Sequence, residues 1–97
     1  MSVLTKSYRE SLLERLQDPA EAAAYLDAAL EDEDNRVFLL ALRDVAEARG
    51  VSRVATEANL NRESLYRMLS EEGNPRLSSL DAVLHTLGLR LAVEVRE

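Results

Sequence analysis

The chain has 97 residues, 46% of them hydrophobic, a size that suits one compact domain rather than two independent cores. It carries 12 basic and 18 acidic side chains, a formal net charge of −6, which excludes a non-specific basic coat for nucleic acid. No apolar run approaches the roughly 20 residues of a membrane span. The first residues lack the apolar core of a signal peptide, and cysteine is absent, so a cytoplasmic protein without disulfides or a membrane partner is expected.

The charge is unevenly distributed along the chain. Residues 1–50 hold six basic and eleven acidic side chains, whereas residues 51–97 hold six and seven. If this chain binds DNA, it does so through a few specific contacts, and a dimer would double their number. The acidic first half is then free to bind a basic protein partner.

Three helices are predicted in the first half. Apolar residues at three- and four-residue spacing indicate an amphipathic helix over 8–16. Asp18 can cap a second helix, and Pro19 fits its first position. A third helix is expected from 36 to 49, capped by Asp34 and ended by Gly50 in a left-handed conformation.

Residues 50–69 have the pattern of a helix-turn-helix. Ala55 stands where the two helices approach most closely, so a larger side chain would force them apart. Asn59 replaces the glycine that is usual in this turn and tolerates a left-handed backbone. The interior of the motif is expected to be sealed by small and apolar residues, namely Val54, Ala58, Leu60, Leu65 and Met68.

The ends of the later helices are marked by short polar residues and glycines. Ser52 and Asn61 are expected to cap the two helices of the motif, and Gly73 to end the second one. The run 78–81 predicts the start of a last helix, with a capping box, that Gly88 closes.

The last segment changes period, because apolar residues alternate with polar or small ones over about 89–95. This two-residue repeat, carried by Leu89, Leu91, Val93 and Val95, predicts a strand. A lone strand leaves backbone groups unpaired, so we expect it to pair with a second copy, in a homodimer that matches a palindromic operator. The alternative is that 89–97 is a short extension lying on the helices.

The predicted fold is therefore all-α. We expect one lambda-repressor-like domain of about six helices over 1–97, with a helix-turn-helix core at about 51–70 and a C-terminal β-strand.

Ten residues are candidates for contact with double-stranded DNA, because the second helix of such a motif enters the major groove. They are Ser52, Arg53, Asn61, Arg62, Glu63, Ser64, Tyr66, Arg67, Asn74 and Arg76. The two arginines of the second helix can bind guanine or phosphate, its glutamate can accept from cytosine, and its tyrosine can touch phosphate or a thymine methyl. The candidate residues before and after that helix suit contacts with the sugar-phosphate backbone of DNA. The alternative is that this helix pair packs as it does in folds that never bind DNA.

No other pattern indicates a chemical site. His85 is the only histidine and has no cysteine nearby, so a structural role is expected rather than a metal ligand. The carboxylates of 31–34 lack the glycine and ligand spacing of an EF-hand, which favours a solvated helix junction. Without a nucleophile-base pair, a glycine-rich phosphate loop or paired acids, we expect no enzyme, cofactor or metal.

Over about residues 20–92 the sequence resembles a family of bacterial addiction-module antidote proteins, the HigA-like antitoxins with a lambda Cro or Xre-type helix-turn-helix. The matching residues are Ala24-Tyr25-Leu26, Ala29-Leu30, Ala41-Leu42, Ala48-Arg49-Gly50, Arg62-Glu63-Ser64-Leu65-Tyr66, Leu69-Ser70, Gly73-Asn74-Pro75 and Leu87-Gly88-Leu89.

The resemblance implies a sequence-specific DNA-binding antitoxin that represses its own operon and neutralises a small toxin resembling RelE-type ribonucleases. A basic toxin would suit the acidic half of this chain. The matching residues lie mainly in the DNA-binding half, so they do not indicate a toxin-binding surface. Two alternatives stay open: a stand-alone phage-type transcriptional regulator, and a toxin-binding module that does not bind DNA.

Overall fold

The computed structural model describes residues 7–97, so the first six residues, which belong to the segment expected not to be a signal peptide, lie outside it. Within the described residues the chain forms six helices and no strand. They are α1 (Tyr8–Arg15), α2 (Pro19–Leu30), α3 (Asn35–Arg49), α4 (Val51–Glu57), α5 (Arg62–Met68) and α6 (Leu77–Thr86). None of these helices is long and apolar enough to cross a membrane.

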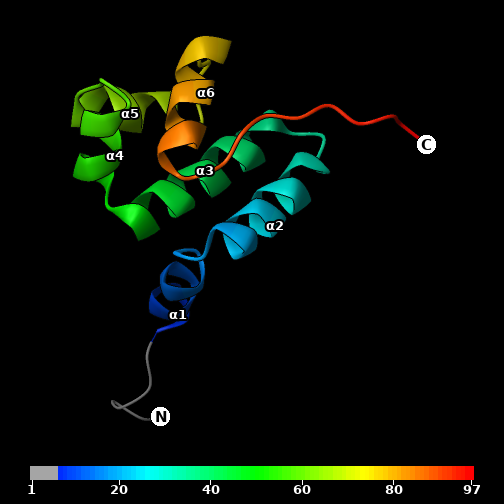
Figure 1. Ribbon diagram of the computed structural model, residues 1–97, viewed down its shortest axis with the longest axis horizontal. Helices are drawn as coiled ribbons and strands as arrows, with labels where there is room; N and C mark the ends of the chain where they lie inside the picture. Colours follow the sequence, from blue (N-terminus) through cyan, green and yellow to red (C-terminus); the bar gives the residue numbers. More distant parts are fainter. Residues whose placement is uncertain (1–6) are drawn as a thin grey trace.

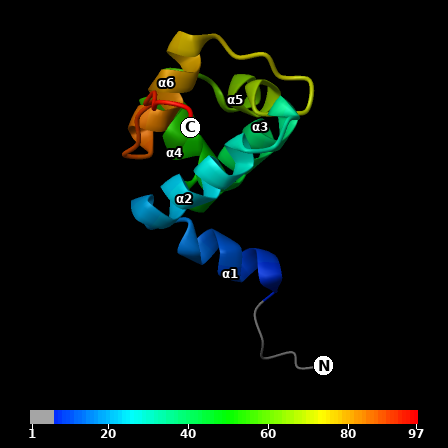
Figure 2. The ribbon, with the colours of Figure 1, turned by 90° about the vertical axis from the view of Figure 1, so that its right-hand side faces the viewer.

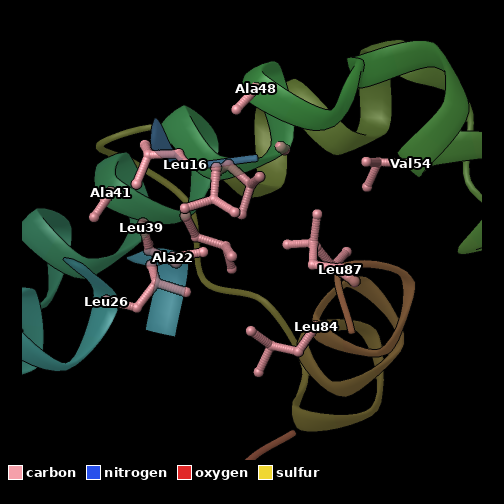
Figure 3. Packing of buried hydrophobic residues seen from close by; sticks show 14 of the residues in the cluster. Leu16, Ala22, Leu26, Leu39, Ala41, Ala48, Val54, Leu84 and Leu87 are labelled. Atoms are coloured by element: carbon pink, nitrogen blue, oxygen red, sulfur yellow. The ribbon is translucent and has the colours of Figure 1, made fainter. Parts of the chain in front are cut away.

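Helix α3 is the central element, and it contacts α1, α2 and α4 (Figure 1). Helix α4 follows from the end of α3 and in turn contacts α5 and α6. Figure 3 shows that Leu84 and Leu87, at the end of α6, point toward the interior that Leu39 of α3 and Leu26 of α2 also enter. All four side chains are buried, and no polar or charged side chain within 7–97 is buried with them.

The first three helices begin where short polar side chains can accept hydrogen bonds from free backbone N–H groups. Asp18 accepts from the N–H of Ala20 with Pro19 at the first helical position, and Asp34 accepts from Arg36 at 2.9 Å, so both predicted caps are confirmed. Helix α1 is capped by Ser7 in a reciprocal capping box that the sequence analysis did not identify.

The predicted cap at Ser52 is wrong. Gly50, with φ +107°, is both the C-cap of α3 and the N-cap of α4, so Ser52 lies within the first turn of α4. The predicted start of α6 is also wrong, because the helix begins at Leu77, before the run 78–81, and no side chain caps it, so the capping box expected there is absent. Its hydrogen bonds begin when Leu80 donates to the carbonyl of Arg76 at 3.0 Å, which makes Arg76 the N-cap.

Gly73 does not end α5 as predicted. Helix α5 ends at Met68, and the chain then turns through a loop in which Gly73 donates to the carbonyl of Ser70 at 2.9 Å. A Cβ atom at position 73 would overlap the Met68 carbonyl. The glycine is therefore required by this close approach of two backbone segments rather than by a helix end. Gly88, with φ +77°, does close α6 as expected.

The predicted C-terminal strand is wrong, because every regular element within residues 7–97 is a helix. After Leu89, whose N–H donates to Leu84 at 2.9 Å, the chain runs on without regular structure (Figure 1). The side chains of Val93 and Val95 are 100% and 91% exposed. An alternating sequence forms a strand only where another strand offers its backbone groups, and every other described element of this chain is a helix.

Candidate nucleic-acid interface

Helices α4 and α5 form a close pair joined by residues 58–61. The N–H of Leu60 donates to the carbonyl of Ala55 at 2.8 Å, and Asn59 has φ +64°, the left-handed conformation expected for it. Ala55 is 2% exposed, as predicted for the point of closest approach, and Leu65 of α5 is 1% exposed. The pair is therefore held by buried contacts that leave the opposite face of α5 open to solvent.

The first turn of α5 is fixed by its cap. Oδ1 of Asn61 accepts from the N–H of Ser64 at 2.7 Å, so of the two roles considered for Asn61 the capping role is confirmed. Ser64 itself is half-buried, whereas Arg62 and Glu63 are exposed. The first turn thus presents one cation and one carboxylate to solvent.

One exposed ion pair lies along this face. Arg67 approaches Glu63 one turn earlier, with 3.7 Å between Nη2 and Oε1, and both side chains are more than 70% exposed. Exposed pairs at this spacing contribute only a few tenths of a kcal/mol, about 0.3–0.5. Breaking this ion pair so that Arg67 can bind a phosphate or a base would therefore cost little free energy.

Tyr66 lies between two guanidinium groups. Arg62 of α5 stands 5.6 Å and Arg43 of α3 stands 4.8 Å from the centroid of its ring. Its hydroxyl donates to Oε2 of Glu47 at 3.4 Å. The ring thus brings a third arginine, Arg43, to this surface, which the sequence analysis did not include. The only sequence feature that could have indicated Arg43 is its four-residue spacing from Glu47, with which it pairs.

A network of charges on α3 supports this surface from behind. Arg9 of α1 bonds to Glu47 and lies 3.1 Å from Asp44, and Tyr25 of α2 donates to Asp44 at 2.7 Å. The Arg9 pKa is raised mainly by its hydrogen bond to Asp44. The pKa of Tyr25 is raised to about 12 by burial and then by the hydrogen bond to Asp44. Helices α1 and α2 are in this way tied to α3 directly behind α5.

A hollow of about 450 Å³ opens where α1, α4 and α5 meet. Four of the ten predicted residues line it, namely Ser52, Arg53, Arg62 and Tyr66. Its other walls come from α1 and from the end of α3, including Arg9 and Glu47. Arg53 also pairs with Glu57 at 3.4 Å on the outer side of α4.

The remaining predicted residues lie outside this hollow. Arg67 and Glu63 occupy the exposed side of α5, and Asn74 and Arg76 are exposed in the loop that leads from α5 to α6 (Figure 2). The ten candidates therefore do not form one compact cluster. They form a band of exposed and half-buried polar side chains along α4, α5 and the following loop.

The described residues offer no group of three histidine, cysteine, aspartate or glutamate side chains that could hold a metal ion. The face around α5 instead gathers arginine side chains and a tyrosine. Such a surface binds planar or anionic partners by hydrogen bonds and cation–π contacts.

The fold and this surface define a small helical domain whose polar face is carried by a tightly joined helix pair. Residues 7–95 match the family described as "Probable addiction module antidote protein". An uncharacterized protein of Haemophilus influenzae is 36% identical over 81 residues, which are 84% of each chain. No solved structure matches the chain.

The chain therefore belongs to the family of probable addiction-module antidote proteins. This membership confirms the resemblance to antidote proteins and implies a toxin as partner.

Proposed function

We propose that this antidote protein binds DNA in a sequence-specific way, represses its own operon and neutralises a partner toxin resembling RelE-type ribonucleases. In this proposal the α4–α5 pair is a helix-turn-helix of the lambda Cro or Xre type, as in HigA-like antitoxins, and α5 is the recognition helix. The observation that carries it is the exposed face of α5, where Arg62 and Arg67 flank Tyr66 on a helix held rigidly by Ala55 and Leu65.

The contacts divide by chemistry. Arg62 and Arg67 have the planar fork that pairs with guanine or clamps a phosphate, and Glu63 can accept from cytosine once Arg67 has left it. The backbone contacts are assigned to Ser52 and Arg53 at the start of α4, and to Asn74 and Arg76 in the loop after α5. Asn61 and Ser64 position this helix start through the cap between them.

The net charge of −6 limits how this binding can work. An acidic chain gains little from non-specific attraction to phosphate, so the contacts of one recognition helix would be too few by themselves. We therefore propose a homodimer that places two copies of α5 on a palindromic operator. The strand pairing first expected for this dimer is excluded by the irregular course of residues 90–97.

One observation favours a second candidate, a toxin-binding module without DNA binding. The carboxylates of Glu63, Glu71 and Glu72 lie on or directly after α5, where they would repel a duplex. A stand-alone regulator has no such support, because membership in an antidote family implies a toxin partner.

The proposal is tested in cells that carry a reporter under the promoter upstream of this gene and, separately, any small basic protein that a reading frame adjacent to this gene encodes, under an inducible promoter. The wild-type chain should repress the reporter and rescue growth when the basic protein is induced. Arg62→Ala with Arg67→Ala should lose repression and keep rescue. The matched control, Arg15→Ala with Arg96→Ala, removes the same charge from two exposed residues outside the α4–α5 surface, one in α1 and one in the C-terminal segment, and should keep both activities.

The outcomes separate the candidates. Rescue by the wild type without repression would support the toxin-binding module, and repression without rescue would support the stand-alone regulator. Repression that survives the loss of both arginines would remove the assignment of α5 as the recognition helix.

A further inference from the structure

A second hollow, an open groove of about 540 Å³, lies between α2, the start of α3, the end of α6 and the C-terminal segment. Its lining is mainly apolar, with Leu26 and Leu30 from α2, Phe38 from α3, and Leu89 and Leu91 from the C-terminal segment. Leu26 is buried at its base, whereas Leu30 is 59% and Leu91 is 40% exposed. Large apolar side chains with this exposure mark a surface at which a bound partner would bury apolar area.

The rim of the groove is acidic. Asp27, Glu31 and Glu94 line it, with Arg90 as the single cation in the lining. Asp32 and Glu33 follow Glu31 directly in the chain. None of the three lining carboxylates forms an ion pair with another residue of 7–97, so their charge is available to a cation from outside.

The groove is remote from the proposed recognition helix. Its lining includes no residue of α4 or α5. In Figure 1 the C-terminal segment extends toward the end of the molecule at which α2 is followed by α3, whereas α4 and α5 lie at the other end. A partner seated in the groove would therefore leave the exposed face of α5 uncovered.

We propose that this groove binds a basic amphipathic segment of the partner toxin, an inference that rests on the antitoxin function proposed above. Apolar side chains of such a segment would cover Leu30 and Leu91, and its lysines or arginines would pair with Asp27, Glu31 and Glu94. Val93, which is fully exposed beside the groove, would also be covered.

The charge of the rim selects this occupant over the two alternatives. Nucleic acid would place phosphates against three carboxylates. A second copy of this chain, with a net charge of −6, would in a two-fold contact place the same acidic rim opposite itself. A positively charged protein segment is the partner for which both the apolar floor and the acidic rim are complementary.

The test uses the purified full chain and, as probe, the basic protein of the growth experiment above, with affinity measured by isothermal titration calorimetry. Asp27→Lys with Glu31→Lys should weaken binding by at least about tenfold, because two attractive charge pairs become repulsive. The matched control, Glu21→Lys with Asp81→Lys, makes the same charge change at exposed residues of α2 and α6 that do not line the groove, and it should bind like wild type.

A second variant tests the apolar floor without changing charge. Leu30→Ser with Leu91→Ser alters two exposed side chains, so it should fold like wild type by circular dichroism and also weaken binding by at least about tenfold. If both groove variants bind the basic protein as tightly as wild type does, the groove is not its site and the inference is overturned. Groove variants that change the mass of the free chain by light scattering would instead assign the groove to a second copy and overturn it equally.

Failure of the proposed function would look different. If the wild-type chain itself does not bind the basic protein, the toxin partnership fails, and the inference falls with it. Weakened binding in both groove variants, with unchanged control and unchanged affinity for operator DNA, would support the groove as the toxin site.

Discussion

The hydroxyl of Tyr66 lies 3.4 Å from Oε2 of Glu47, so the proposed recognition helix α5 is joined to the central helix α3 by a polar contact. The same carboxylate bonds to Arg9 of α1 and lies 3.9 Å from Arg43. Glu47 thus connects α1 and α3 with α5, and the side chain that faces DNA in our proposal is positioned by residues that would not touch it.

Replacing this carboxylate by an amide, Glu47→Gln, should lower the free energy of unfolding by about 1 kcal/mol, because two partly exposed ion pairs with arginine are lost. Urea denaturation at low and high salt measures this, and the difference from wild type should shrink at high salt. Tyr66→Phe is the control, since it removes only the hydroxyl contact and keeps the ring between Arg43 and Arg62. A salt-independent loss in Glu47→Gln would contradict an electrostatic role.

The closest approach of α4 and α5 at Ala55 gives a second prediction. Ala55→Leu should destabilise the fold by about 1–3 kcal/mol, because there is no space for three more carbons at a residue that is 2% exposed. The matched control is Thr56→Leu, the exposed neighbour in the same helix, which should cost less than about 0.5 kcal/mol. Thermal unfolding compares the two variants, and equal midpoints would show that the helices are not in close contact.

Gly73 gives a third prediction. In Gly73→Ala the new Cβ would overlap the Met68 carbonyl, so the loop that carries Asn74 and Arg76 must shift. We expect a loss of stability of about 1–3 kcal/mol together with weaker DNA binding. Glu72→Ala, at the exposed preceding residue, is the control and should change stability little. Wild-type stability in Gly73→Ala, measured by urea denaturation, would contradict this backbone contact.

The sequence predicted the parts of the fold that depend on local backbone chemistry. Asp18 and Asp34 cap helices because a short carboxylate next to a free N–H group does so in any context. Asn59 adopts its positive φ, and Gly88 closes α6 as expected. These features require no knowledge of the other helices.

The missed features depend on neighbours that are distant in the sequence. Ser52 has the chemistry of a cap, but Gly50 takes that position because α3 and α4 share it. Arg43 reaches Tyr66 only because α3 passes behind α5. The alternation over 89–95 has the period of a strand, but no other strand is present among the described residues to pair with it. Of the candidate site, the arginines of α5 were predictable, and the network behind Tyr66 was not.

The contact between Tyr25 and Asp44 gives a prediction for alkaline pH. The Tyr25 pKa is raised from 10.0 to about 12, first by burial and then by the hydrogen bond to Asp44. The folded state therefore holds this proton more tightly than the unfolded state, so its contribution to stability is full below pH 10 and is lost as the pH rises toward 12.

Tyr25→Phe removes the titrating group and should lose less stability than wild type over this pH window. The difference between the tyrosinate absorbance titrations of wild type and Tyr25→Phe should have its midpoint near pH 12. A midpoint near 10.0, the ordinary value, would show that Tyr25 is not held against Asp44.

The central claim is that α5 binds the operator, and fluorescence anisotropy of a labelled duplex from the upstream promoter tests it most directly. The wild-type chain should bind this duplex more tightly than a scrambled one of equal length. Arg62→Ala with Arg67→Ala should weaken specific binding by at least about 100-fold, since each bidentate arginine contact contributes about 1–3 kcal/mol of discrimination. Arg90→Ala with Arg96→Ala should bind like wild type. Equal binding of the promoter duplex by the wild type and the Arg62/Arg67 double variant would contradict the claim.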